Sequence, residues 1–129
     1  MPFDFERLDV YNVAIEFVAV ANAIKRRLPE GYADLADQLQ RAATSIVLNI
    51  AEGAGEYSRA EKARFYRFAR RSAFECAAVL DIMLKLHLAD ATEASNGRDL
   101  LDRIGAMLTK MATQLEKPGS GSGSGSGSV

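Results

Sequence analysis

The sequence has very few cysteines and histidines, and this scarcity excludes whole classes of protein. Among its 129 residues there is one cysteine, Cys76, so no disulfide can form within the chain. A protein without disulfides is expected in a reducing cytoplasm. There is also one histidine, His87, whereas the metal sites of di-iron bundles need Glu-x-x-His on two helices. We therefore expect no metal and no cofactor.

Long apolar runs and an excess of one charge are also missing. No apolar stretch reaches ~18 residues, so we expect no helix that spans a membrane. Sixteen lysines and arginines oppose seventeen acids, which gives a formal net charge of −1. Because dedicated nucleic-acid-binding domains usually have a strong basic excess, the average charge argues against that class.

What the sequence has is helical periodicity, interrupted by a few prolines and glycines. No segment alternates with period two, so no strands are expected. We predict an all-α protein, an antiparallel up-down four-helix bundle in one domain over residues 1–117. The predicted helices lie at about 5–28, 32–54, 58–88 and 91–116. Residues 118–129, a proline followed mostly by alternating glycine and serine, are typical of an engineered flexible linker.

Local patterns mark the ends of these helices. Ser58 followed by Glu61, and Asp90 followed by Glu93, are capping-box patterns at the third and fourth helices. Gly53 and Gly55 are expected to end the second helix, because glycine adopts the left-handed conformation of helix ends.

The first predicted helix has apolar side chains on two sides. One stripe suits a bundle core, and a second stripe is rotated well away from it. Since large exposed apolar patches are rare on monomers, the second stripe predicts a homo-oligomer. The alternative is a monomer in which this helix is centrally enclosed. The candidate subunit interface consists of Leu8, Tyr11, Ile15, Val18, Val47 and Leu48.

A polar stripe lies beside the core stripe of the second helix. Its candidate members are Arg41, Ser45, Asn49 and Glu52. Small uncharged side chains suit a close helix contact in which hydrogen bonds are made locally. The stripe is therefore either a buried polar seam that fixes helix register or subunit pairing, or an ordinary half-exposed flank.

The third helix begins with a cluster of cations. They are Arg59, Lys62, Arg64, Arg67, Arg70 and Arg71, opposite an apolar arc that includes Phe65, Phe68, Ser72 and Cys76. Arginine suits phosphate oxygens, and Tyr57 or Tyr66 could stack on a base, so the cations are a candidate nucleic-acid surface. The alternative is a solvated face paired with Asp34, Asp37, Glu56 and neighbouring subunits.

No constellation of residues indicates catalysis. Cys76 falls on the apolar arc of the third helix, where a small buried side chain is expected rather than a nucleophile. His87 is three helical turns further along and cannot act as its base. We therefore expect that the protein is not an enzyme.

Two stretches resemble a known family. "LDVYNVA" at 8–14 and "QLQRAATSIVLNIAEGAGEYSRAEKARFYRFARRSAFE" at 38–75 are similar to the 23S ribosomal RNA intervening-sequence proteins. The resemblance covers nearly all of residues 3–117. It implies an up-down bundle that assembles as a homopentamer and has no established catalytic activity. A related group, the accessory variability determinants of diversity-generating retroelements, binds a reverse transcriptase and its RNA through basic surfaces.

Together these features predict a cytoplasmic structural or interaction protein whose partner is itself, in a ring-forming homo-oligomer. The family resemblance implies that the ring has five subunits. The alternative is an accessory protein that binds nucleic acid or a reverse transcriptase through the arginine-rich third helix. The retroelement proteins are strongly basic overall, and this chain is not.

Overall fold

A computed structural model describes residues 4–118 of the chain. Within that range it has a short 3-10 turn, η1 (Asp4–Arg7), and four helices without any strand. The helices are α1 (Asp9–Arg27), α2 (Ala33–Gly55), α3 (Arg59–Lys85) and α4 (Ala91–Glu116). The predicted all-α class and the four helices are confirmed. The predicted linker lies outside the described residues from 119 onward.

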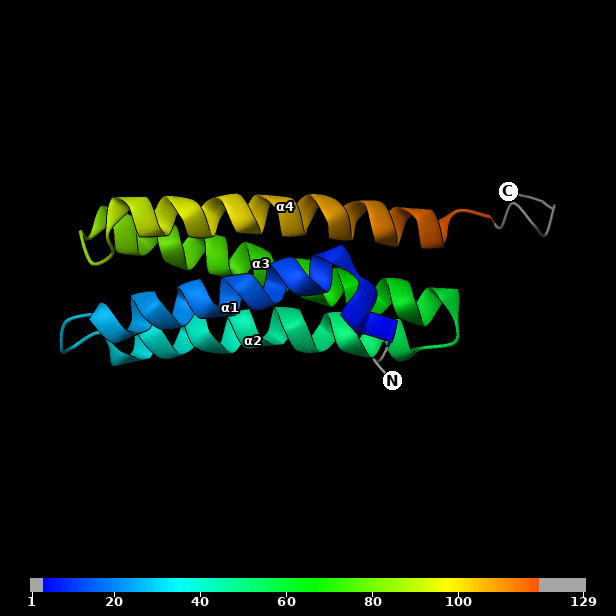
Figure 1. The fold of residues 1–129 in the computed structure, drawn as a ribbon, viewed down its shortest axis with the longest axis horizontal. Helices are drawn as coiled ribbons and strands as arrows, with labels where there is room; N and C mark the ends of the chain where they lie inside the picture. Colours follow the sequence, from blue (N-terminus) through cyan, green and yellow to red (C-terminus); the bar gives the residue numbers. More distant parts are fainter. Residues whose placement is uncertain (1–3, 119–129) are drawn as a thin grey trace.

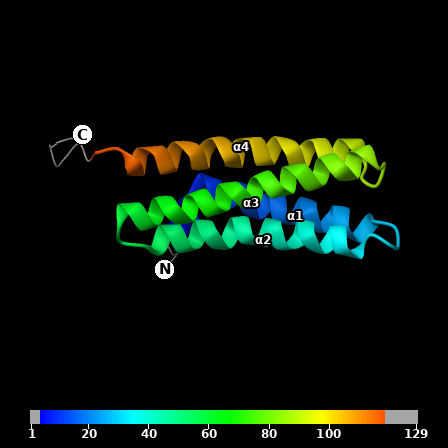
Figure 2. The same ribbon diagram turned by 180° about the vertical axis from the view of Figure 1, so that it is seen from behind.

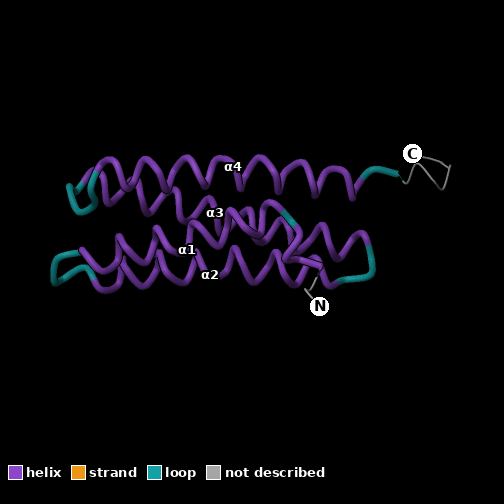
Figure 3. The backbone as a smooth tube through the Cα atoms, viewed as in Figure 1, coloured by secondary structure: helices purple, strands orange, loops and turns teal. Residues whose placement is uncertain are grey.

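The helices run alternately up and down and pack as a square (Figure 1, Figure 3). Each packs against its neighbours in chain order, and α4 closes the square on α1. The view from behind shows α3 in front of α1 (Figure 2). Helices α1 and α3 are therefore on one diagonal, and α2 and α4 are on the other.

The first helix begins later than predicted. Leu8 is extended, with φ −79° and ψ 129°, and separates η1 from α1. Its side chain makes no capping hydrogen bond. The side chain of Asn12 instead reaches back to the carbonyl oxygens of Leu8 and Glu6, at 3.2 and 3.3 Å. Because η1 is itself helical, the helical pattern in the sequence begins several residues before α1.

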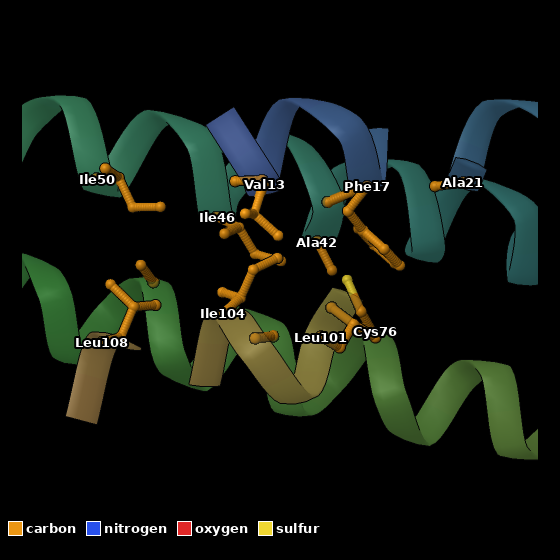
Figure 4. Packing of buried hydrophobic residues seen from close by; sticks show 14 of the residues in the cluster. Val13, Phe17, Ala21, Ala42, Ile46, Ile50, Cys76, Leu101, Ile104 and Leu108 are labelled. Carbon is orange, nitrogen blue, oxygen red and sulfur yellow. The ribbon is translucent and has the colours of Figure 1, made fainter. Parts of the chain in front are cut away.

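The core lies between the α1–α2 and α3–α4 pairs. Figure 4 shows Val13, Phe17 and Ile46 from the first pair pointing toward Ile104 and Cys76 from the second. All five side chains are buried, and no polar or charged residue among the described ones is buried. In the middle of α4, Leu101, Ile104 and Leu108 are buried and contribute to this core.

The buried stripe of α3 differs from the predicted one. Its first half buries small residues and one aromatic ring, namely Ala63, Tyr66, Ala69 and Ala73. Phe65 and Phe68 were expected in the apolar arc, but they are only half-buried. The reason is the position of the stripe: Phe65 and Phe68 lie beside the buried residues on the helix surface, where Arg64 packs on both rings.

The helix ends follow local chemistry. Ser58 Oγ accepts the N–H of Glu61, and Asp90 Oδ2 accepts the N–H of Glu93, each at 3.0 Å, so both predicted N-caps are confirmed. The reason given for Gly53 is wrong, because among the described residues a positive φ occurs only at Gly31 and His87. A Cβ on Gly53 would lie 2.7 Å from a ring carbon of Tyr66. Gly53 is there for close packing.

Candidate interaction surfaces

The predicted subunit interface divides into covered and exposed side chains. Leu8, Tyr11, Val18 and Val47 are partly buried against the core of their own chain. The Tyr11 ring also packs on Phe5, with 4.8 Å between ring centroids. The expectation that α1 has a second stripe uncovered by its own chain is therefore too broad.

Two of the six predicted interface residues remain exposed. Ile15 is 44 % exposed on α1, and Leu48 is 58 % exposed on α2. Large apolar side chains that the sequence analysis did not select are exposed as well: Phe74 at 56 % and Ile82 at 46 %, both on α3. The signal for Phe74 was present in the sequence, because it lies off the apolar arc among the arginines.

The polar stripe of α2 contains a small hydrogen-bonded cluster that reaches α3. Asn49 Nδ2 donates to the carbonyl oxygen and to Oγ of Ser45, at 2.9 and 3.0 Å. The hydroxyl groups of Ser45 and Ser72 are hydrogen-bonded at 2.9 Å. All three side chains are partly buried. Arg41 and Glu52, the outer members of the predicted stripe, are exposed and do not join the cluster.

The carboxylates that form ion pairs with the cations of α3 are not the predicted ones, although the charge of Glu56 adds to the effect of Glu61 in raising the pKa of Arg64. Arg64 pairs with Glu61 at 2.9 Å, and Arg67 Nε donates to Glu116 of α4 at 2.8 Å. Asp37, expected opposite α3, pairs instead with Lys25 of α1 at 3.4 Å. These contacts lower the pKa of both glutamates, because a hydrogen bond from arginine stabilises the carboxylate.

The remaining cations bind neutral oxygens or aromatic rings. Arg59 donates to the carbonyl oxygen of Gln114 at 2.9 Å, and Arg70 donates to Thr109 Oγ1 at 2.7 Å. Lys62 donates to the carbonyl oxygens of Gly53 and Ala54, at 3.3 and 2.9 Å, at the C-terminus of α2. A cation suits that end of a helix dipole.

Arginine and phenylalanine alternate on the outer side of α3. Arg64 lies 5.1 Å from the Phe65 centroid and 5.2 Å from that of Phe68, on which Arg71 also packs at 5.7 Å. Arg70 lies 4.4 Å from the Phe74 centroid. The predicted stacking role is wrong for Tyr66, whose ring is buried, while Tyr57 is fully exposed.

Two concave surfaces complete the outside of the bundle. We call the first the α3/α4 groove, a depression of about 630 Å³ with small side chains along its floor. Its lining includes Ala73, Ala77, Gly105 and Ala106, with Phe74 beside them. We call the second the α2 hollow, of about 550 Å³. Its lining includes Arg41, Thr44, Ser45 and Leu48.

The two groups considered for chemistry, Cys76 and His87, lie in different surroundings. Burial raises the pKa of the Cys76 thiol to about 12, with a smaller contribution from Glu75. His87 is exposed in the loop after α3, with φ +57°. Across residues 4–118 no group of histidines, cysteines and acids could hold a metal ion. In the same range, no helix combines the length and the apolar character needed to cross a membrane.

Comparison with known proteins agrees with this architecture. A solved protein of unknown function from the S23 ribosomal protein family, from Bacteroides thetaiotaomicron, superimposes with a TM-score of 0.74 at 20 % identity. The match covers 80 % of this chain and 97 % of that one. No curated protein matches the sequence. The family model described as 23S rRNA-intervening sequence protein matches residues 6–110, and the chain therefore belongs to the 23S rRNA-intervening sequence protein family.

Proposed function

We propose that the protein is a non-enzymatic interaction protein that assembles with copies of itself into a closed ring. The observation that supports this most directly is the exposure of large apolar side chains on both sides of the bundle: Ile15 and Leu48 on α1 and α2, and Phe74 on α3. Apolar surface of this kind marks protein interfaces. The family resemblance favours five copies, and the single buried cysteine favours a reducing cytoplasm.

Native mass spectrometry and light scattering of the purified chain test this proposal. We expect one dominant species of five times the 14.0 kDa protomer mass. Another closed stoichiometry would correct the number of copies and retain the ring. A monomer at all concentrations up to the millimolar range would overturn the proposal.

A second candidate, nucleic-acid binding, is favoured by a specific observation on α3. Four of its six cations, namely Arg59, Lys62, Arg70 and Arg71, have no carboxylate partner within the described residues. In a ring this surface would be repeated, and repeated weak contacts gain avidity. We expect any such binding to weaken steeply with added salt.

Charge reversal tests the second candidate. Replacing Arg59, Lys62 and Arg71 together by Glu should abolish RNA retention at low salt and leave the assembly mass unchanged. The matched control reverses Arg26, Arg103 and Lys110, which are exposed cations elsewhere on the bundle. Equal loss in both triple variants would show non-specific attraction, and no retention by the unmodified protein would remove this candidate.

A further inference from the structure

We infer that the outer face of α2 in one copy packs level and parallel on the α3/α4 groove of the next copy. This rests on the proposed function, because it names the two surfaces that join the ring. Phe74 of one copy enters the α2 hollow of its neighbour, and Leu48 of that neighbour lies against the end of the α3/α4 groove. The occupant of each surface is therefore a second copy of this chain.

The first argument is height along the bundle. The Ser45–Ser72 hydrogen bond sets residues 45 and 72 at one level, and the Arg70–Thr109 hydrogen bond relates α3 to α4 at nearly the same level. Counting along the helices at 1.5 Å per residue, the α2 hollow around Thr44 is level with Phe74. Copies related by an axis parallel to the bundle meet at equal heights, so these two features can touch.

The second argument is shape. Phe74 projects with 56 % of its surface exposed, and Thr44 and Ser45 leave a depression in the α2 hollow beside Leu48. By the same count of levels, Leu48, which is 58 % exposed, meets the end of the α3/α4 groove beside Arg70 and Thr109. Large side chains that insert between small ones on the facing helix are the usual form of helix packing.

The third argument is charge. Arg41 lies on the rim of the α2 hollow, and Asp102 lies on the rim of the α3/α4 groove. Continuing the same count of levels from Ser45 and Thr109, Arg41 and Asp102 come to nearly equal heights. Both are exposed, and neither has an ion-pair partner within residues 4–118. The proposed packing brings this pair of opposite charges together.

The fourth argument is closure. In the square bundle α2 is a neighbour of α3, so its outer face and the α3/α4 groove are not on diametrically opposite sides. Two different surfaces that meet head to tail give a ring when the rotation between copies closes. Here each added copy turns in the same sense about an axis parallel to the helices.

Two single variants test the pairing. Leu48→Glu places a charge on the outer face of α2 and should prevent its contact with a neighbouring copy. Phe74→Glu should do the same at the α3/α4 groove. Both positions are exposed, so both variants should fold with wild-type helicity by circular dichroism. We expect each variant alone to be a monomer. Mixed in equal amounts, they should form a dimer containing one of each, because each retains the surface that the other has lost.

The outcomes separate this inference from the proposed function. If the unmodified protein forms a ring and both variants keep the ring mass, the pairing is overturned while the ring stands. If each variant alone forms a dimer, each surface pairs with itself, and the head-to-tail arrangement is wrong. If the variants are monomers that do not combine on mixing, Leu48 and Phe74 do not lie on two surfaces that meet, and the pairing is overturned. Tyr57→Glu is the control, since Tyr57 is fully exposed outside both surfaces and should leave the ring intact.

A charge swap provides an independent test. Arg41→Asp and Asp102→Arg should each weaken assembly, seen as a higher concentration at which half of the copies dissociate. The double variant should restore assembly toward the wild-type value, because the pair is then formed with reversed signs. If the double variant is as weak as the sum of the single variants, the two side chains do not meet.

Discussion

At the scale of single residues, Gly53 determines how closely α2 and α3 approach. Its backbone conformation is ordinary, and the space beside it is filled by the ring of Tyr66. Tyr66 is 5 % exposed and is the only aromatic residue among the buried ones on the described part of α3. The glycine and the ring therefore form one packing unit.

Replacing Gly53 by Ala should lower the free energy of unfolding by about 1–2 kcal/mol. The new Cβ would overlap the Tyr66 ring, and overpacking of this kind costs about 1–3 kcal/mol, partly offset by the better helix propensity of alanine. Urea unfolding followed by circular dichroism measures the change. The control is Gly55→Ala, because nothing lies within 4 Å of a Cβ at Gly55. If the two variants have equal free energies of unfolding, the added Cβ at residue 53 does not destabilise the contact between α2 and α3.

Because of Cys76, the free energy of unfolding should decrease at alkaline pH. Its thiol has a pKa raised from 9.0 to about 12 in the folded protein, so between these values the unfolded chain releases a proton that the folded chain keeps. The unfolded state then binds fewer protons, and stability falls as pH rises through this window. We expect a larger loss of unfolding free energy between pH 7.5 and pH 10 in the unmodified protein than in Cys76→Ala.

The comparison between these two proteins isolates the thiol. The pKa of Tyr66 is also raised by burial, but this contribution is present in both proteins. The native protein should also resist iodoacetamide at pH 8 and react after unfolding in urea. Rapid alkylation of the folded chain would contradict the burial of Cys76.

The burial of Cys76 could be predicted from the sequence, whereas the role of Gly53 could not, and the difference has a physical reason. Cys76 lies in the second half of the predicted arc, where the apolar periodicity continues and the arc is buried, whereas Phe65 and Phe68 in the first half are only half-buried. Whether a glycine serves a turn or a close contact depends on what the neighbouring helix presents, and only the packed bundle shows Tyr66 there.

At the scale of helices, the Ser45–Asn49–Ser72 cluster joins the middle of α2 to the middle of α3. Ser45→Ala removes the hydroxyl that both partners use. We expect a loss of about 1 kcal/mol in unfolding free energy, typical of one net hydrogen bond in a partly buried position. Urea unfolding provides the measurement.

A control variant and a double variant show whether the effect comes from the Ser45–Ser72 contact. Ser95→Ala changes an exposed serine of α4 and should alter stability by less than about 0.5 kcal/mol. Ser72→Ala added to Ser45→Ala should cost little more than either change alone, because both remove the same contact. Additive losses would mean that the two hydroxyl groups act separately.

Helix ends are predictable where their chemistry is local. Ser58 and Asp90 cap the N–H groups three residues onward, and both partners are visible in a short stretch of sequence. The start of α1 is not local in this sense, since the extended Leu8 follows a 3-10 turn that packs on α2. The partners of Arg67 and Arg70 were also beyond prediction, because they come from α4, far along the chain.

At the scale of the whole molecule, assembly should be visible in thermal unfolding. Anything that binds only the folded state stabilises it by mass action, and copies of the chain are such a ligand. We expect the melting temperature to rise as protein concentration increases over about two orders of magnitude. Differential scanning calorimetry measures this directly. Leu48→Glu should melt at a temperature independent of concentration, and the same independence in the unmodified protein would argue against assembly.

In an up-down bundle with an even number of helices, the first helix begins and the last helix ends toward the same end of the bundle. Helix α1 begins, and the neighbouring helix α4 ends, in the half of the bundle where α2 turns into α3 (Figure 1). A circular permutant can therefore join the start of α1 to the end of α4 by a linker in that half of the bundle and open the chain between α1 and α2, near Gly31. Every helix would keep its neighbours, while cargo fused to the new termini would be displayed at the opposite pole.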